Sequence, residues 1–155
     1  MTVRLEQATT AAQLDEARAL FREYQAAIGV DLCFQGFEAE LAALPGAYAP
    51  PGGRLLLARD GAAAVACGAL RPIGPGVAEL KRMWTRPDRR GHGVARALAT
   101  ALLEAARAEG YRLVRLDTLD WMAAARALYA SLGFQEIPAY YPNPLAGVVY
   151  LELAL

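Results

Sequence analysis

A strand–helix–strand pattern in the second half of the sequence constrains the fold more than any other feature. Val77 to Thr85 is typical of a strand, and Pro87-Asp88 ends it. From Val94 to Gly110, apolar residues recur every three or four positions, which predicts a long amphipathic helix. Tyr111 to Asp117 alternates between apolar and polar residues and predicts another strand. Because a helix separates the two strands, we expect them to pair in parallel.

Further elements are predicted on both sides of this unit. One helix is predicted from an N-cap at Thr9 or Thr10 to Gly29. Two more are predicted at Phe37–Leu44 and Met122–Leu132. The strands are Val3–Ala8, Arg54–Arg59, Ala62–Leu70, Phe134–Ile137 and Val148–Leu153, with turns at Asp60-Gly61 and Pro72–Gly76. The order β-α-α-β-β-β-α-β-α-β-β predicts an α+β fold, a mostly antiparallel sheet with one parallel step. With 155 residues, we expect a single domain over residues 1–155.

Composition excludes several classes of protein. Sixteen basic and sixteen acidic residues cancel to a net charge of zero, which argues against nucleic-acid binding through a broad basic face. No run of about 18 apolar residues and no signal peptide is evident, so we expect a cytoplasmic protein that does not bind membranes. Two cysteines and one histidine predict neither a metal site nor a disulfide framework.

The segment Arg89-Arg90-Gly91-His92-Gly93-Val94-Ala95 joins the first strand of this unit to its helix. A helix N-terminus offers unpaired N–H groups and partial positive charge, and glycines allow close backbone approach, so the segment suits a pyrophosphate. A plain turn with solvated arginines is the alternative. A dinucleotide-binding fingerprint would need a small residue where Arg96 stands, and the sequence contains no Gly-Lys-Ser/Thr of a Walker loop.

Two motifs make the assignment more specific. Arg90-x-x-Gly93-x-Ala95 resembles the Arg/Gln-x-x-Gly-x-Gly/Ala signature of the GNAT superfamily of acyl-CoA N-acyltransferases. Further on, Ala125-x-x-Leu128-Tyr129-x-x-x-Gly133-Phe134 is similar to the family's second motif, a helix that ends in Gly-Phe before a strand. The resemblance spans roughly Val77 to Ile137, and it implies an N-acetyltransferase that uses acetyl-CoA as its donor.

The resemblance also implies where the donor binds. The strand that carries Met83-Trp84-Thr85 should diverge from the strand Leu113–Thr118, and pantetheine should lie in the gap. Met122 stands where many relatives have an asparagine that binds the cofactor, so that single contact is in doubt. The implied cofactor-binding residues are Met83, Trp84, Thr85, Arg90, Gly91, His92, Gly93, Val94, Ala95 and Arg96.

Two residues are predicted to carry the chemistry. Glu79 occupies the strand position of a general base in several GNAT enzymes, and it should face the same side as Met83 unless a bulge intervenes. The alternative role for Glu79 is an ion pair with Lys81, Arg82 or Arg115. Tyr129 matches the family tyrosine that protonates the departing thiolate, and its alternative role is core packing.

The acceptor is the least constrained part of the prediction. Cys33 and Phe34 should line its entrance, and Tyr140-Tyr141 should form a pocket wall, cover the sheet edge or make a dimer contact. The sequence lacks a strongly acidic stripe, which favours a small-molecule amine over a basic peptide. A homodimer is compatible with family habit. The alternatives are a non-catalytic acyl-CoA-binding regulatory module and a dinucleotide-dependent oxidoreductase.

Overall fold

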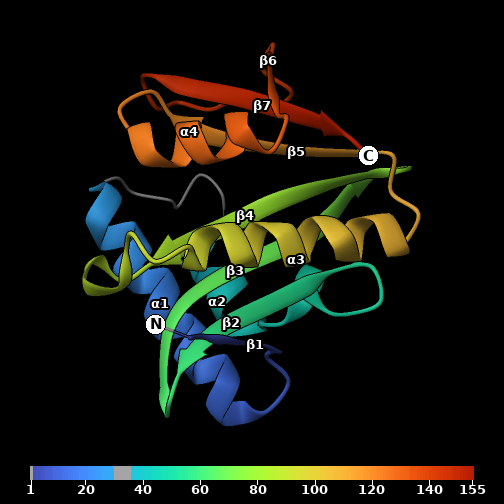
Figure 1. The fold of residues 1–155 in the computed structure, drawn as a ribbon. Helices are drawn as coiled ribbons and strands as arrows, with labels where there is room; N and C mark the ends of the chain where they lie inside the picture. The colour runs from blue at the N-terminus through green and yellow to red at the C-terminus, as the bar shows by residue number, and fades with distance from the viewer. Residues whose placement is uncertain (1, 30–35) are drawn as a thin grey trace.

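The computed structural model describes residues 2–29 and 36–155, and these form one seven-stranded sheet flanked by helices (Figure 1). The strand order across the sheet is β1-β2-β3-β4-β5-β7-β6. The strands are β1 (Arg4–Gln7), β2 (Arg54–Asp60), β3 (Ala63–Gly74), β4 (Val77–Thr85), β5 (Leu113–Leu119), β6 (Gln135–Ile137) and β7 (Val148–Ala154). The α-helices are α1 (Ala11–Ile28), α2 (Phe37–Ala43), α3 (Val94–Ala108) and α4 (Ala123–Ser131).

The predicted fold class is confirmed, including its parallel step. β4 and β5 pair in parallel, and the other neighbouring strands pair antiparallel. The predicted turn Pro72–Gly76 was too long, because β3 continues to Gly74. Pro72 is tolerated there since the pairing shifts register between Pro72 and Gly74 and does not need every ladder hydrogen bond. None of the helices within residues 2–29 and 36–155 is long and apolar enough to cross a membrane.

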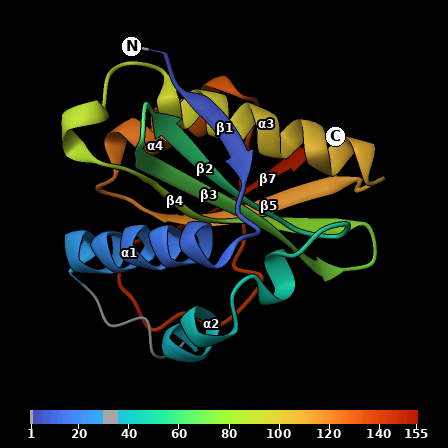
Figure 2. The same cartoon turned by 90° about the horizontal axis from the view of Figure 1, so that it is seen from below.

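The two faces of the sheet are covered by different helices. Figure 2 shows α1 and α2 beneath the sheet, with α3 and α4 above it. Helix α1 begins as predicted at Thr10, whose hydroxyl accepts from the Gln13 amide while the Gln13 side chain accepts from the Thr10 amide. It ends at Gly29 in the left-handed conformation.

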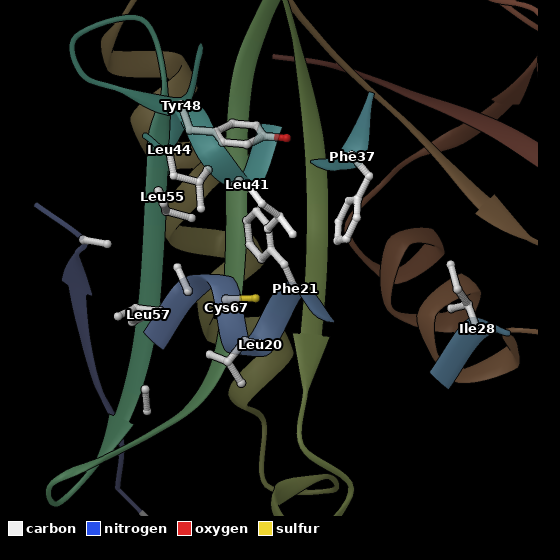
Figure 3. Packing of buried hydrophobic residues seen from close by; sticks show 14 residues of the cluster. Leu20, Phe21, Ile28, Phe37, Leu41, Leu44, Tyr48, Leu55, Leu57 and Cys67 are labelled. Carbon is white, nitrogen blue, oxygen red and sulfur yellow. The ribbon is translucent and has the colours of Figure 1, made fainter. Parts of the chain in front are cut away.

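Each face has its own apolar core. Figure 3 shows Leu20 and Phe21 of α1 beside Leu55 and Leu57 of β2, with the Cys67 side chain of β3 among them. On the other face, the buried stripe of α3 packs on β2, β3 and β4. Its members are Val94, Leu98, Ala99, Leu102, Leu103 and Ala106. Removal of this apolar surface from water stabilises the position of the N-terminus of α3 relative to the sheet.

A bulge interrupts β4 before its carboxyl end. Cys67 pairs with Trp84 and Ala69 with Lys81, so Arg82 and Met83 together face the single residue Gly68. Arg82 has a φ of 59°, the left-handed conformation that accompanies such an irregularity. Beyond the bulge the alternation of side chains is inverted. Strand β4 therefore changes which residues it presents to each face just before the loop that follows it.

Candidate active site

The predicted divergence of β4 and β5 is present. The two strands pair only from Val77↔Leu113 to Glu79↔Arg115, and no pairing continues toward Thr85. Where they separate, a cavity of about 510 Å³ opens against the N-terminus of α3 and the start of α4. The lining includes Met83, Trp84, Thr85, Arg90, Gly91, Gly93, Val94, Ala95, Arg96, Trp121, Met122 and Tyr129. The cavity volume lies within the range of small-molecule and cofactor sites.

The glycine loop at one end of the cavity is built from backbone. Gly91 and Gly93 have φ values of 80° and 78°, which glycine adopts without strain. Gly93 is the N-cap of α3 and makes no side-chain capping hydrogen bond. The first amides of the helix are therefore left for a ligand, with the positive end of the helix dipole behind them. This arrangement can hold an anion such as a pyrophosphate.

Three of the arginines around the loop, Arg86, Arg89 and Arg90, contact other groups of the protein. Arg86 pairs with Glu23, and Arg89 pairs with Asp60 and Asp88. Arg90 donates from Nε to the Thr85 carbonyl at 3.0 Å, and its guanidinium lies 4.8 Å from the centre of the Trp84 ring. These contacts hold the loop against the end of β4. The anion-binding capacity thus rests on backbone amides more than on arginine charge.

Tyr129 of α4 stands where two cavities meet. It is 6% exposed, packs against Phe134 with ring centres 5.6 Å apart, and lines both the large cavity and a smaller gap of about 50 Å³ between β4 and β5. Burial, with smaller contributions from Tyr24 and Asp117, raises the pKa of the Tyr129 phenol above its ordinary value. The phenol consequently stays protonated at neutral pH and can act as a proton donor.

The small gap between the strands is lined by polar groups from several elements. Its lining includes Tyr24 of α1, Lys81 and Arg82 of β4, Asp117 and Thr118 of β5, and Tyr129 of α4. Lys81 is buried, and burial lowers the pKa of its ammonium group despite the nearby Glu79 carboxylate. The gap thus brings a carboxylate and a protonated phenol to the same place.

Glu79 lies apart from this gap. It is 2% exposed and lines neither cavity. Arg71 donates from Nε to its Oε1 at 2.9 Å, and Tyr140 donates to its Oε2 at 2.5 Å. The predicted partner Lys81 is 3.9 Å from Oε1. Glu79 and Met83 face opposite sides of the sheet, because the bulge that the prediction named as its exception lies between them, at Arg82 and Met83.

The segment between β6 and β7 carries the predicted tyrosine pair onto the face that α1 and α2 cover (Figure 2). Tyr140, Tyr141 and Tyr150 form a cluster of edge-to-face rings with centres 5.3 to 5.6 Å apart. Tyr140 bonds Glu79, and Tyr141 donates to Asp117 Oδ2. Burial raises the pKa of both phenols, and the carboxylates they contact raise it further.

Most of the residues predicted to bind the cofactor line the large cavity. Other residues, for which no such role was predicted, line the cavity or the gap as well. His92 is exposed and is not among the cavity-lining residues. Cys33 and Phe34 lie outside the described residues. No functional role was predicted from the sequence for Trp121 or Asp117. Trp121 is 60% exposed and lines the cavity, and Asp117 lines the gap. The available signal for Asp117 was its position, as a carboxylate on the strand predicted to diverge beside the cofactor.

Comparisons with known proteins point to one family. The model of the acetyltransferase (GNAT) family matches residues 11–134. An uncharacterized N-acetyltransferase of Schizosaccharomyces pombe is 40% identical over 92% of this chain and 88% of its own length. A GNAT-family acetyltransferase from Staphylococcus aureus superposes with a TM-score of 0.82 at 18% identity, with 99% of each chain covered.

A further solved structure contains a bound cofactor. The PaiA N-acetyltransferase of Thermoplasma acidophilum, in complex with coenzyme A, has a TM-score of 0.76 at 14% identity, with 100% of both chains covered. At that identity the likeness shows the fold. Because the family model covers most of the sequence, the chain belongs to the GNAT family of acetyltransferases. It is an N-acetyltransferase, and the family uses acetyl-CoA as the acyl donor.

Proposed function

We propose that this protein transfers the acetyl group of acetyl-CoA to a primary amine of a small molecule, by direct attack within a ternary complex. The observation that carries the proposal is the position of Tyr129 at the junction of the large cavity and the small gap. A thioester that reaches this junction from the large cavity would present its carbonyl carbon to the gap and its sulfur to the phenol.

The donor would be held mainly by backbone groups. The loop from Arg90 to Ala95 would bind the pyrophosphate through its amides, with Arg96 at the rim. The pantetheine arm would run between β4 and β5, where Met83, Trp84 and Thr85 line the cavity and the strands no longer pair. Unpaired backbone groups there can bond the arm as an added strand would. Backbone N–H groups at the divergence would also stabilise the oxyanion.

The reaction would proceed in one displacement. The amine nitrogen attacks the thioester carbonyl, the C–S bond breaks, and Tyr129 gives its proton to the departing sulfur. The sequence predicts Glu79 as the base, and this assignment stays a prediction. Its support is the family position on β4. Its two oxygens already accept hydrogen bonds from Arg71 and Tyr140.

The preference for a small acceptor rests on the gap and its surroundings. The gap of about 50 Å³ has room for the amine end of a substrate. The described charges of its lining include both signs, with Lys81 and Arg82 beside Asp117, and do not form an acidic stripe. Such a stripe would be expected if the substrate were a strongly basic peptide or polyamine.

Amine-dependent release of thiol from acetyl-CoA tests the proposed activity. A panel of primary amines, amino acids and basic peptides should give release with at least one small amine, and mass spectrometry should find that amine acetylated. Acetyl-CoA binding without release from any acceptor would instead support a non-catalytic acyl-CoA-binding module. If NAD(P) competed with acetyl-CoA for the cavity, the alternative of a dinucleotide-dependent oxidoreductase would be favoured.

A further inference from the structure

We propose that Asp117 is the carboxylate that receives the acceptor's ammonium group and takes its proton, and that Tyr141 and Asn143 hold it in place. The inference rests on the proposed acetyl transfer and names the acceptor group that this site takes, a protonated primary amine. It differs from the assignment of Glu79, because the two carboxylates lie on different strands and have different surroundings.

Asp117 is positioned where the strands have already separated. The pairing of β4 with β5 ends at Arg115, two residues before Asp117, while β7 continues to pair with β5 through Asp117↔Tyr150. The side chain therefore lies on the part of β5 that borders the gap. Leu116 belongs to the core on the α3 side, so Asp117 points toward the opposite face, together with Arg115.

The carboxylate and the phenol approach the gap from opposite sides. Tyr129 packs in the core that contains Leu116, and Asp117 contacts Tyr141 on the other face. Both residues nevertheless line the same gap of about 50 Å³. An amine on Asp117 and a thiol beside Tyr129 would therefore sit on either side of one carbonyl carbon, as direct attack requires.

A short chain of hydrogen bonds fixes the orientation of Asp117. The Tyr141 hydroxyl donates to Asp117 Oδ2. Asn143 in turn donates from Nδ2 to the Tyr141 hydroxyl oxygen at 3.0 Å, and the Leu145 amide donates to Asn143 Oδ1 at 3.0 Å. Tyr150 donates to the Tyr141 carbonyl at 3.1 Å. An ionised carboxylate has about four acceptor positions, so a bond from Tyr141 leaves capacity for an ammonium group. Tyr141 and Asn143 are thus positioning residues.

Glu79 has a different environment. Arg71 also approaches its Oε1 through the second guanidinium nitrogen at 2.8 Å, and Tyr140 covers Oε2. Both carboxylate oxygens of Glu79 are therefore engaged by groups of the protein itself, which leaves less capacity for an incoming ammonium group. Its burial among these partners indicates that Glu79 anchors Tyr140 to the sheet. Because Tyr141 is the next residue, this contact also holds Tyr141 in place.

Asp117 and Tyr129 account for every proton that moves in the reaction. Asp117 takes one proton from the ammonium group, and the freed lone pair forms the C–N bond while the C–S bond breaks. Tyr129 protonates the sulfur, the second nitrogen proton restores the phenol, and Asp117 releases its proton to water. Within residues 2–29 and 36–155, the charged or titratable groups around Asp117 include Tyr24, Glu79, Lys81, Arg82, Arg115, Tyr129, Tyr140, Tyr141, Tyr150 and Glu152.

The test uses the full chain and the amine of the panel that gives the fastest thiol release. We expect Asp117→Asn to lower kcat/KM for that amine by about 10²-fold or more, as for loss of a general base. Asparagine can still accept from Tyr141, so the acetyl-CoA affinity and the melting temperature should stay close to those of the wild type. Glu152→Gln breaks the neighbouring ion pair with Arg115 and is the matched control, expected to change kcat/KM by less than about threefold.

The pH dependence separates a base from a merely structural residue. The acidic limb of the kcat/KM profile should be absent in Asp117→Asn and present in Glu79→Gln. Tyr141→Phe should lower kcat/KM but keep the acidic limb, because the carboxylate is still present and only the hydroxyl that orients it is lost. A wild-type rate in Asp117→Asn, or an acidic limb that disappears only in Glu79→Gln, would overturn the inference while leaving the acetyl transfer intact. Failure of wild-type thiol release with every amine would remove the proposed function itself.

Discussion

The proposed donor side of this site consists mainly of backbone groups, whereas the proposed acceptor side consists of side chains. The proposed donor cavity is lined by a glycine loop, the first turn of α3, the end of β4 and the start of α4, and the anion site at the loop rests chiefly on backbone amides. The acceptor side is formed by side chains that reach it from distant segments. Tyr24, Lys81, Asp117 and Tyr141 come from α1, β4, β5 and the connection between β6 and β7.

This difference explains how each side can be altered. Backbone amides are supplied by any residue that permits the loop conformation, so a donor site tolerates many sequences provided that its glycines remain. A side-chain site depends on the identity of each residue and on the register of the strands that carry them. We therefore expect the fold to preserve acetyl-CoA binding while substitutions on the acceptor side change which amine is used.

The largest effect is expected at the residue that both sides share. Tyr129→Phe removes the proton donor and should lower kcat by about 10²–10⁴, with little change in acetyl-CoA affinity. Tyr111→Phe, which removes a hydroxyl bonded to the Gly52 carbonyl outside both cavities, is the control and should leave kcat near the wild-type value. Steady-state kinetics with a calorimetric Kd for acetyl-CoA distinguishes the two. Unchanged turnover in Tyr129→Phe would remove the phenol from the mechanism.

A smaller effect is expected within the donor loop. Space for a methyl group is available at Gly93, but its φ of 78° would cost alanine about 1–2 kcal/mol. We expect Gly93→Ala to weaken acetyl-CoA binding by about 5–30-fold, since relief of the strain misaligns the amides. Gly110→Ala is matched, with a φ of 87° and open space at the other end of α3. It should lower the melting temperature without changing the Kd, and equal Kd values for the two variants would contradict a backbone-built donor site.

The smallest expected effect is tighter acetyl-CoA binding by a variant on the donor side. Met122→Asn restores the amide that the family resemblance places at this position, and asparagine is also a better N-cap for α4 than methionine. One added hydrogen bond of about 0.5–1.5 kcal/mol should tighten acetyl-CoA binding by about 2–10-fold. An unchanged Kd, measured by competition, would mean that the cofactor arm passes Met122 out of reach of an amide.

The same difference decides what could be predicted from the sequence. The parallel step, the separation of β4 from β5 and the loop at Gly91 and Gly93 follow from periodicity, glycine positions and family motifs, all of which are local in sequence. The partners of Glu79 could not be predicted, because Arg71 and Tyr140 lie 8 and 61 residues away and meet it only through the sheet order. The bulge at Arg82 has no sequence signal of its own, since it places a non-glycine residue at positive φ.

The most direct test of the account is one calorimetric measurement, the Kd of acetyl-CoA for the wild type, Gly93→Ala and Asp117→Asn. If the donor side is built from the loop and the acceptor side from side chains, Gly93→Ala should weaken binding by about 5–30-fold. Asp117→Asn should bind acetyl-CoA within about twofold of the wild type although its kcat/KM falls by about 10²-fold or more. Weaker binding in Asp117→Asn than in Gly93→Ala would contradict the separation of the two sides.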